Sequence, residues 1–343
     1  MALTGRERLI LVDFLHMAHL YFDSPNIARL SYNGVETTIS AYTIKRLYHM
    51  TKGGHYLGVA LEGGSPFRKE YFKEQADGTD TQGSGYKGNR KGLNPLFRKS
   101  LNTAVGLMEQ AKVTTYRKDG FEADDMIYSV IQQLKSVNKE NPIDVFTNDA
   151  DLLPLVDEQV SVYVRGTRTY CTEGSPMSDK YFQVTPKTWS LFMGSSSAFK
   201  GYYIPYNSLL LFKMLRGDTS DNISAVIVKN KAGKVLKFGK KTYSELVEKM
   251  EADGVDFANT FRYVAITADN RLDEEYRAEV GAYFDKTIKP VLAGYFEEEA
   301  TQGMRYNYIG MNLRAVSADL QCLTQIPLET LNPTYLKYGI HIR

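Results

Sequence analysis

The chain has 343 residues, of which 43% are hydrophobic and 24% are charged, and its formal net charge is +2. This composition is typical of a globular protein with one large or two ordinary domains. No apolar run approaches the roughly 20 residues of a membrane helix, so we expect no membrane partner. The first residues lack a signal-peptide apolar stretch, and the two cysteines have no metal-ligand spacing. We therefore expect a reduced, cytoplasmic setting.

Short apolar runs followed by carboxylates recur along the first half of the chain. The pairs are 9–12 with Asp13, 56–61 with Glu62, and 143–147 with Asp149 and Asp151. Each run predicts a buried parallel strand, and ligands of open α/β sheets bind beyond the carboxyl ends of such strands. Alternation over residues 160–164 predicts one more strand.

Segments in which apolar residues recur at helical spacing lie between and after these strands. We expect helices over 40–51 and from about 122 onward, and further helices over 206–215, over 243–250 and within 274–292. The order strand, helix, strand, helix, strand predicts an α/β fold, with a mostly parallel central sheet flanked by helices.

The stretch from Phe121 to Ile127 holds three carboxylates, Glu122, Asp124 and Asp125, at an expected helix start. One interpretation is a solvated helix start that the helix dipole favours. The other is a cation site, because neighbouring carboxylates repel one another unless a cation lies among them. Many acids and few histidines favour Mg²⁺ or Mn²⁺ over zinc. We ascribe His16 and His19, three residues apart, to packing or hydrogen bonding.

Two basic segments accompany the acids. Residues 66–99 are rich in Lys and Arg around a glycine-rich centre at 77–85, which fits either a solvated loop or a flexible element that binds phosphates. Tyr71, Phe72 or Tyr86 would be available there for base stacking. Residues 222–243 contain six lysines and no acid. The carboxylates could bind two divalent cations, and the basic segments could bind the phosphates of a nucleic acid. Together they predict a metal-dependent phosphodiesterase that acts on nucleic acid.

Six stretches also resemble, in order, the 5′-nuclease superfamily of phage and bacterial flap endonucleases and of the 5′→3′ exonuclease domains of bacterial DNA polymerases. They cover roughly residues 9–245. The stretches are Leu11-Val12-Asp13, Phe67-Arg68-Lys69-Glu70, Tyr86-Lys87-Gly88-Asn89-Arg90, Glu122-Ala123-Asp124-Asp125, Asp149-Ala150-Asp151-Leu152-Leu153 with Leu155-Val156, and Gly217-Asp218-Thr219-Ser220-Asp221-Asn222-Ile223.

The resemblance implies a PIN-like nuclease core over residues 1–175, with a helical arch in 66–99. It also implies a helix–hairpin–helix-like duplex-binding region over 176–270. A C-terminal extension over 271–343 follows, in which the sequence shows no functional signal. It implies cleavage by two divalent ions, Mg²⁺ or Mn²⁺, near single-strand/duplex junctions of branched or 5′-ended DNA. We expect a phage-encoded monomer that works with replication proteins.

The resemblance also implies roles for individual residues. The first ion takes Asp13, Glu122, Asp124, Asp149 and Asp151; the second takes Asp125, Asp218 and Asp221; Glu62 completes the metal set. Lys87 and Arg90 contact the scissile phosphate. Arg68 matches a basic position at the base of the arch. From composition and charge we also expect nucleic-acid contacts at Tyr86, Lys229, Lys231, Lys234, Lys237, Lys240 and Lys241.

The chain departs from the family pattern at two places. Glu62 stands where the family usually has Asp, which bears on the spacing of the ions. Residues 224–231 replace a short Pro/Gly-rich hairpin, which bears on the K⁺ ion that such hairpins often bind.

Three alternatives stay open beside a DNA nuclease. A ribonuclease that removes RNA primers from RNA–DNA hybrids would use the same chemistry. A catalytically silent DNA-structure binder would have lost its acids, whereas nearly every acidic position here is filled. A PIN-type toxin ribonuclease would be far shorter and would lack the 217–223 motif.

Overall fold

The computed structural model describes residues 7–25, 27–51, 55–73, 85–88, 92–137, 140–165, 181–229, 235–236, 238–268 and 273–318. The chain forms two compact units. Unit 1 comprises Met1–Gly64, Lys91–Thr185 and Ser317–Arg343, and unit 2 comprises Ser65–Arg90 and Pro186–Val316. Residues 66–90, which sequence analysis grouped with the nuclease core, thus cluster with the second half of the chain.

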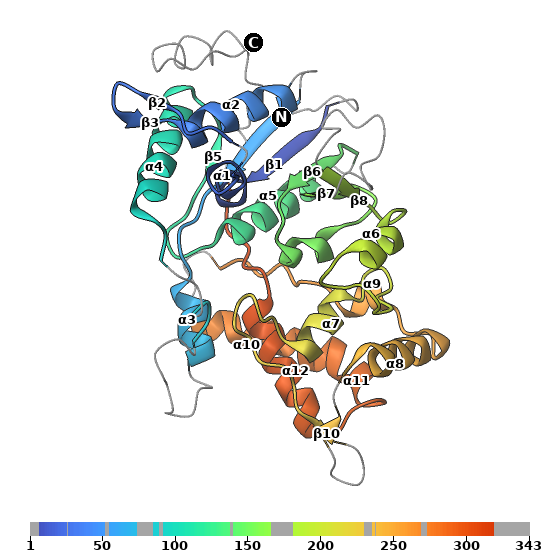
Figure 1. Cartoon of the computed structure of the whole chain (residues 1–343). Coiled ribbons are helices and arrows are strands. Elements are labelled where there is room, and N and C mark those ends of the chain that lie inside the picture. Colours follow the sequence, from blue (N-terminus) through green and yellow to red (C-terminus); the bar gives the residue numbers. More distant parts are fainter. Residues whose placement is uncertain are drawn as a thin grey trace. The chain divides into compact units, whose positions relative to one another are not determined.

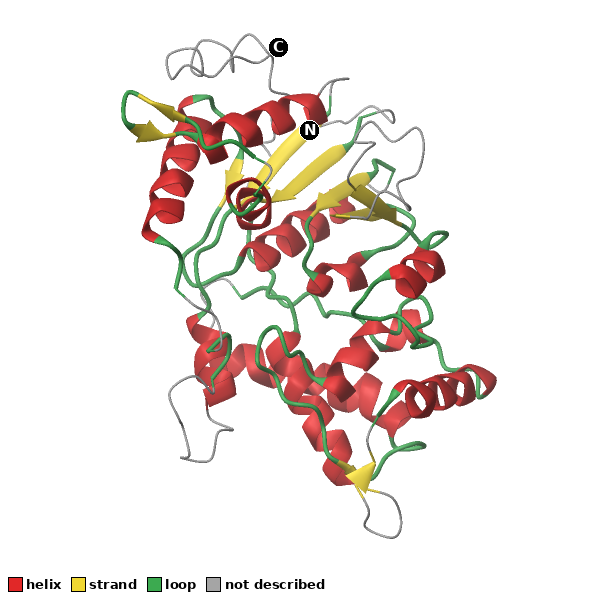
Figure 2. Ribbon diagram, in the orientation of Figure 1, coloured by secondary structure: helices red, strands yellow, loops and turns green. Residues whose placement is uncertain are grey.

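Unit 1 is built on a six-stranded sheet with the order β5-β4-β1-β6-β7-β8 (Figures 1 and 2). The strands are β1 (Leu9–Asp13), β4 (Tyr56–Ala60), β5 (Thr115–Tyr116), β6 (Ile143–Phe146), β7 (Val160–Arg165) and β8 (Tyr181–Val184). All neighbours run parallel except β7 and β8. The predicted α/β fold with a mostly parallel sheet is confirmed, and β5 and β8 are additions to it.

The helices of unit 1 cover both faces of this sheet. They are α1 (Phe14–Phe22), α2 (Thr38–Thr51), α4 (Pro95–Gln110), α5 (Ala123–Val137) and the 3₁₀ helix η1 (Ala150–Leu155); a small hairpin, β2 (Ser31–Tyr32) with β3 (Val35–Glu36), lies between α1 and α2. Ile10 and Val12 share a core with residues of α1, α2 and α4. Alternate residues of a strand face opposite ways, and α5 packs on β1 and β4 from the other side.

The strand order reverses at β1. The chain passes from β1 to β4 on one side, and later returns through α5 to β6 on the other side. The carboxyl ends of β1, β4 and β6 therefore meet where an open α/β sheet has its ligand crevice. Asp13 is the last residue of β1, and Glu62 and Thr147 follow the ends of β4 and β6.

Unit 2 is mostly helical. Its elements are α3 (Pro66–Lys73), α6 (Trp189–Ser195), α7 (Leu209–Arg216), β9 (Val228–Lys229), β10 (Val235–Leu236), α8 (Lys240–Ala252), α9 (Phe257–Thr260), α10 (Asp273–Tyr283), the π-helix η3 (Phe284–Ile288), α11 (Lys289–Leu292) and α12 (Glu298–Met311). The antiparallel pair β9–β10 lies in sequence between α7 and α8. Helix α12 packs on α3, α7 and α10. None of the helices described in either unit is long and apolar enough to cross a membrane.

Candidate metal centre

The carboxylate at the end of β1 is held by two hydrogen bonds. Asp13 is buried, and its Oδ1 accepts from the backbone N–H of His16 at 3.1 Å because Asp13 caps α1. Its Oδ2 accepts from the Thr147 hydroxyl at 2.9 Å, and that hydroxyl in turn accepts from the N–H of Asp149 at 2.9 Å. Thr147 thereby joins the end of β1 to the turn after β6. Sequence analysis placed Thr147 in a strand and had no signal for this role.

The acids at the start of α5 divide into two kinds. Asp125 is fully buried, and its Oδ2 accepts from the backbone N–H of Glu122 at 3.0 Å. A first-turn acid that reaches back to the residue before the helix satisfies an amide that has no partner within the helix. Asp125 thus supports the helix start, whereas Asp124 lies in the first turn with its carboxylate among other acids.

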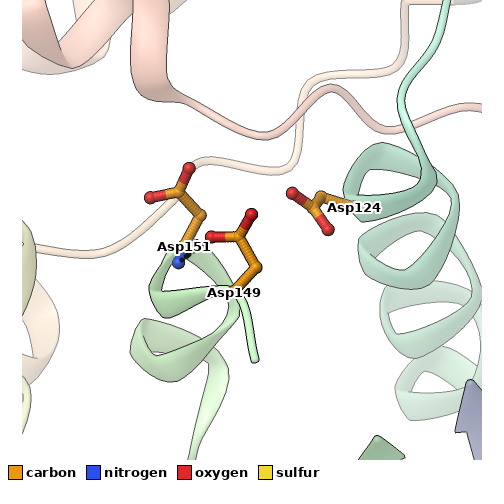
Figure 3. A group of neighbouring side chains, drawn as sticks. All are labelled: Asp124, Asp149 and Asp151. Carbon is orange, nitrogen blue, oxygen red and sulfur yellow. Dashed lines mark hydrogen bonds between the residues drawn. The ribbon is translucent and has the colours of Figure 1, made fainter. Parts of the chain in front are cut away.

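The turn after β6 supplies two more carboxylates. Asp149 caps η1, with its Oδ1 accepting from the N–H of Asp151 at 2.9 Å. Asp151 lies in the first turn of η1, where exposed backbone amides favour a negative charge. Carboxylate oxygens of Asp124, Asp149 and Asp151 all lie within 4.8 Å of one another. Figure 3 shows these three side chains, the acid trio, converging from the starts of α5 and η1.

The electrostatics of the trio favour a cation. Burial of the Asp124 carboxyl raises its pKa well above the usual range. Negative charge raises this pKa further, from Asp149, Asp13, Asp151 and Glu122 in decreasing order. These are the five acids that the resemblance assigns to the first ion, and the structure brings them together in unit 1. Clustered carboxylate oxygens suit Mg²⁺, Mn²⁺ or another oxygen-seeking divalent cation, so the residues present fit such an ion.

Glu62 lies beside the start of α5. Its side chain is exposed, and its Oε2 accepts from the backbone N–H of Ala123 at 3.3 Å. Its metal role stays a prediction.

The acidic motif of unit 2 has a different environment. The carboxylate of Asp218 accepts from the Lys213 ammonium at 2.8 Å, and from both the N–H and the hydroxyl of Ser220. Burial alone would raise the pKa of Asp218, but the Lys213 charge and these hydrogen bonds lower it to about 2. Asp221 is buried, and its carbonyl accepts from the N–H of Lys87 at 3.0 Å. Sequence analysis assigned no role to Lys213.

Two residues predicted to contact nucleic acid are buried within unit 2. The guanidinium of Arg68 donates to the carbonyls of Gly310 and Asn312 at 3.3 and 3.4 Å. Tyr86 is 6% exposed and stacks on Phe72. Their nucleic-acid roles stay predictions.

The remaining predicted cations lie in or near the 222–243 segment. Lys229 forms an ion pair with Glu299 at 3.0 Å, and Lys241 forms one with Glu245 at 3.7 Å. Lys240 begins α8 and is exposed. Arg90, Lys231, Lys234 and Lys237 lie outside the described residues, as do residues 77–84.

The two N-terminal histidines make ordinary contacts in unit 1. His19 interacts with Asp23 at 2.6 Å and stacks on Phe97, while burial lowers the pKa of His16. This agrees with the packing role expected for the pair.

The chain shares sequence with DNA polymerases and exonucleases. It is 25% identical over 229 residues to DNA polymerase I of Bacillus subtilis, with 65% of this chain and 22% of that protein covered. It is 32% identical over 114 residues to the 5′-3′ exonuclease of Mycoplasma pneumoniae, with 32% of this chain and 31% of that protein covered. The chain thus matches less than a third of the length of either relative.

Solved structures share the fold. The T5 5′-exonuclease with bound zinc ions is 15% identical, with a TM-score of 0.52 over 97% of this chain and 99% of that one. The bacteriophage T5 flap endonuclease, in a pseudo-enzyme–product complex with DNA and metal ions, is 15% identical with a TM-score of 0.50, over 97% of this chain and 98% of that one.

A family model described as "5′-3′ exonuclease, N-terminal resolvase-like domain" matches residues 8–182, just over half of the chain. The match includes β1, α5, β6 and η1, which position the acid trio. The chain therefore belongs to the 5′-3′ exonuclease N-terminal resolvase-like family, within the 5′-nuclease superfamily that its motifs resemble.

Proposed function

We propose that the chain is a divalent-metal-dependent 5′ nuclease that hydrolyses phosphodiesters of DNA near single-strand/duplex junctions. The observation that carries this proposal is the acid trio, with carboxylate oxygens within 4.8 Å of one another and with the pKa of Asp124 raised by burial and by its carboxylate neighbours. Relatives named 5′-3′ exonuclease and DNA polymerase I support 5′→3′ polarity and a nucleic-acid substrate. The T5 structures, solved with metal ions and with DNA, support the same chemistry.

The residues of unit 1 act by holding and orienting oxygen ligands. Asp124, Asp149 and Asp151 would hold one cation, which when bound supplies positive charge to activate a water and to stabilise the leaving oxygen. Thr147 fixes Asp13 against the Asp149 turn, so that the carboxylates do not rearrange as charge develops. Lys87 contributes positive charge to the scissile phosphate.

The resemblance assigns a second cation to Asp125 of unit 1 and to Asp218 and Asp221 of unit 2, and this assignment stays a prediction. Asp125 accepts from the Glu122 amide, and Asp218 is paired with Lys213. A cation that takes oxygen ligands from these residues competes with those partners. The second ion is therefore expected to bind more weakly than the first.

The proposal is tested by cleavage of an end-labelled 5′-flap substrate under single-turnover conditions with Mg²⁺, Mn²⁺ or EDTA. A blunt duplex and an RNA–DNA hybrid serve as parallel substrates. Asp151→Asn removes one charged ligand of the trio, and Asp119→Asn is the matched control because Asp119 is exposed in the turn before α5. We expect Asp151→Asn to lower the rate by about 10³-fold, since a metal ion contributes several kcal/mol to transition-state stabilisation.

Junction binding by Asp151→Asn should stay within about threefold of wild type, since phosphate contacts supply most of the affinity. Cutting near the junction that requires metal supports the proposal. If the RNA–DNA hybrid is cut as fast as the flap, the result would favour removal of RNA primers. Binding without cutting in every metal would favour a catalytically silent DNA-structure binder. Wild-type cleavage by Asp151→Asn would exclude the trio as the metal centre.

A further inference from the structure

Lys87 lies in a tight turn with unusual backbone geometry. Its backbone φ is +54°, in the left-handed region that residues other than glycine rarely adopt. The turn is closed by a hydrogen bond from the N–H of Gly88 to the carbonyl of Gly85 at 2.7 Å. Such a conformation persists where the surrounding structure holds it in place. The contacts that hold this turn therefore determine where the Lys87 side chain begins.

The first set of contacts comes from the acidic motif of unit 2. The N–H of Lys87 donates to the carbonyl of Asp221 at 3.0 Å, and the side-chain amide of Asn222 donates to the carbonyl of Gly85 at 3.1 Å. Asn222 has a left-handed backbone too, with φ of +61°. Two left-handed residues are thus hydrogen-bonded into one assembly, which fixes the turn on that side.

The second set of contacts is aromatic. Tyr86 stacks on Phe72 with ring centroids 5.5 Å apart and an angle of 15° between the rings. Tyr86 also packs with Ile223 and Met311, the last residue of α12. The residue before Lys87 is therefore anchored between the end of α3, the acidic motif and α12.

Helix α12 in turn sets the position of Phe72. A Cβ built on Gly310 would lie 2.1 Å from the Phe72 ring, so only glycine allows this close approach. One turn earlier on α12, Tyr306 stacks on Tyr71 with centroids 4.5 Å apart. The Tyr306 hydroxyl donates to the carbonyl of Tyr71, and the Tyr71 hydroxyl donates to the carbonyl of Tyr306 at 3.2 Å. These bonds fix α3 along α12.

We propose that α12 is the positioning element for Lys87, acting through a chain of contacts from Gly310 to Phe72, from Phe72 to Tyr86 and from Tyr86 to Lys87. Gly310 and Tyr306 are positioning residues in this scheme. The inference rests on the proposed function, because it concerns the charge that Lys87 brings to the scissile phosphate. It gives a role to part of the C-terminal extension, where the sequence carried no functional signal.

The test compares two glycines on the same helix. Gly310→Ala introduces a methyl group against the Phe72 ring, whereas a Cβ at Gly303 meets only the side chain of Val226 at 3.1 Å. Both changes favour the helix equally, so Gly303→Ala is the matched control. We expect Gly310→Ala to lower the single-turnover rate on a 5′-flap by about tenfold, as misplacement of a catalytic group does, and Gly303→Ala to stay within about 1.5-fold.

A double variant separates positioning from general damage. If Gly310 acts through Lys87, then Gly310→Ala combined with Lys87→Ala cuts no more slowly than Lys87→Ala alone. Multiplied losses in the double variant would overturn the inference, since the change would then act independently of Lys87. An unchanged rate for Gly310→Ala beside a slow Lys87→Ala would overturn this inference alone.

Two outcomes keep the inference distinct from the proposed function. Wild-type cleavage by Lys87→Ala would remove Lys87 from the reaction, and this inference with it, while metal-dependent cutting would still stand. If Gly310→Ala does not fold, Tyr306→Phe deletes only the hydroxyl that holds Tyr71. We expect Tyr306→Phe to lower the rate about threefold in the wild-type background. In the Lys87→Ala background, adding Tyr306→Phe should not lower the rate further. Equal loss in both backgrounds would again overturn the inference.

Discussion

The two groups of aspartates in this chain differ in the charge of the side chains around them. In the acid trio of unit 1, burial and surrounding carboxylates raise the pKa of Asp124. In unit 2, the Lys213 charge and the hydrogen bonds from Lys213 and Ser220 outweigh the effect of burial and lower the pKa of Asp218 to about 2. The charged groups that shift the pKa of Asp124 are all carboxylates. Asp218, in contrast, is already paired with the ammonium group of Lys213. Acid density alone thus does not identify a metal centre; the charges around the acids also determine how strongly the site favours a cation.

The largest expected effect comes from neutralising the centre of the trio. Asp124→Asn should lower single-turnover cleavage by about 10³-fold, since several kcal/mol of metal stabilisation is lost. In EDTA the same change should raise the free energy of unfolding by about 1 kcal/mol, because it removes one carboxylate from a cluster of mutually repelling carboxylates. Urea unfolding with and without metal measures this. A fall in stability in EDTA would show that the trio is balanced without an ion.

The opposite expectation applies to unit 2. Lys213→Met should lower the free energy of unfolding by about 3 kcal/mol, because it leaves the Asp218 carboxylate largely buried without its partner. Combining it with Asp218→Asn should restore more than half of that loss. Urea unfolding of the single and double variants makes the comparison. A cost below about 1 kcal/mol for Lys213→Met would mean that solvent screens the pair.

The smallest effect is the pH dependence that Asp218 contributes. Its folded pKa of about 2 lies below the usual 3.8, so its ionised form stabilises the folded state. This contribution is complete above about pH 5 and is lost as the pH falls through 3.8 towards 2, with a total of about 2 kcal/mol. The difference in unfolding free energy between wild type and Asp218→Asn, measured from pH 2 to 6, isolates it. A flat difference over that range would contradict the assigned pKa.

The sequence was sufficient to predict the strands β1, β4, β6 and β7 and the gathering of the five acids assigned to the first ion. Apolar runs that end in carboxylates indicate buried parallel strands, and strand polarity then places Asp13 and Asp149 at one edge. Strand β5 has only two residues, and β8 follows residues without a clear pattern, so neither was predicted.

Partners distant in sequence could not be predicted. Nothing near Thr147 indicates that its hydroxyl joins Asp13 to Asp149, and nothing near Arg68 indicates Gly310 and Asn312 as its acceptors. Asp125 was grouped with the metal ligands by its position in the motif, although its local hydrogen bond supports the start of α5. These roles depend on tertiary contacts, and a linear pattern does not contain them.

The pairing of β1 with β6 determines when the candidate metal centre can assemble during synthesis of the chain. Leu9 pairs with Ile143, so Asp13 cannot reach Thr147 and the trio until the ribosome has made both strands. At typical elongation rates this interval is on the order of ten seconds. Until then, the nascent chain carries one acidic strand end and no assembled centre. A chain truncated before Asp149 would therefore lack the assembled acid trio, and the proposed cleavage would require β6 and η1 to be complete.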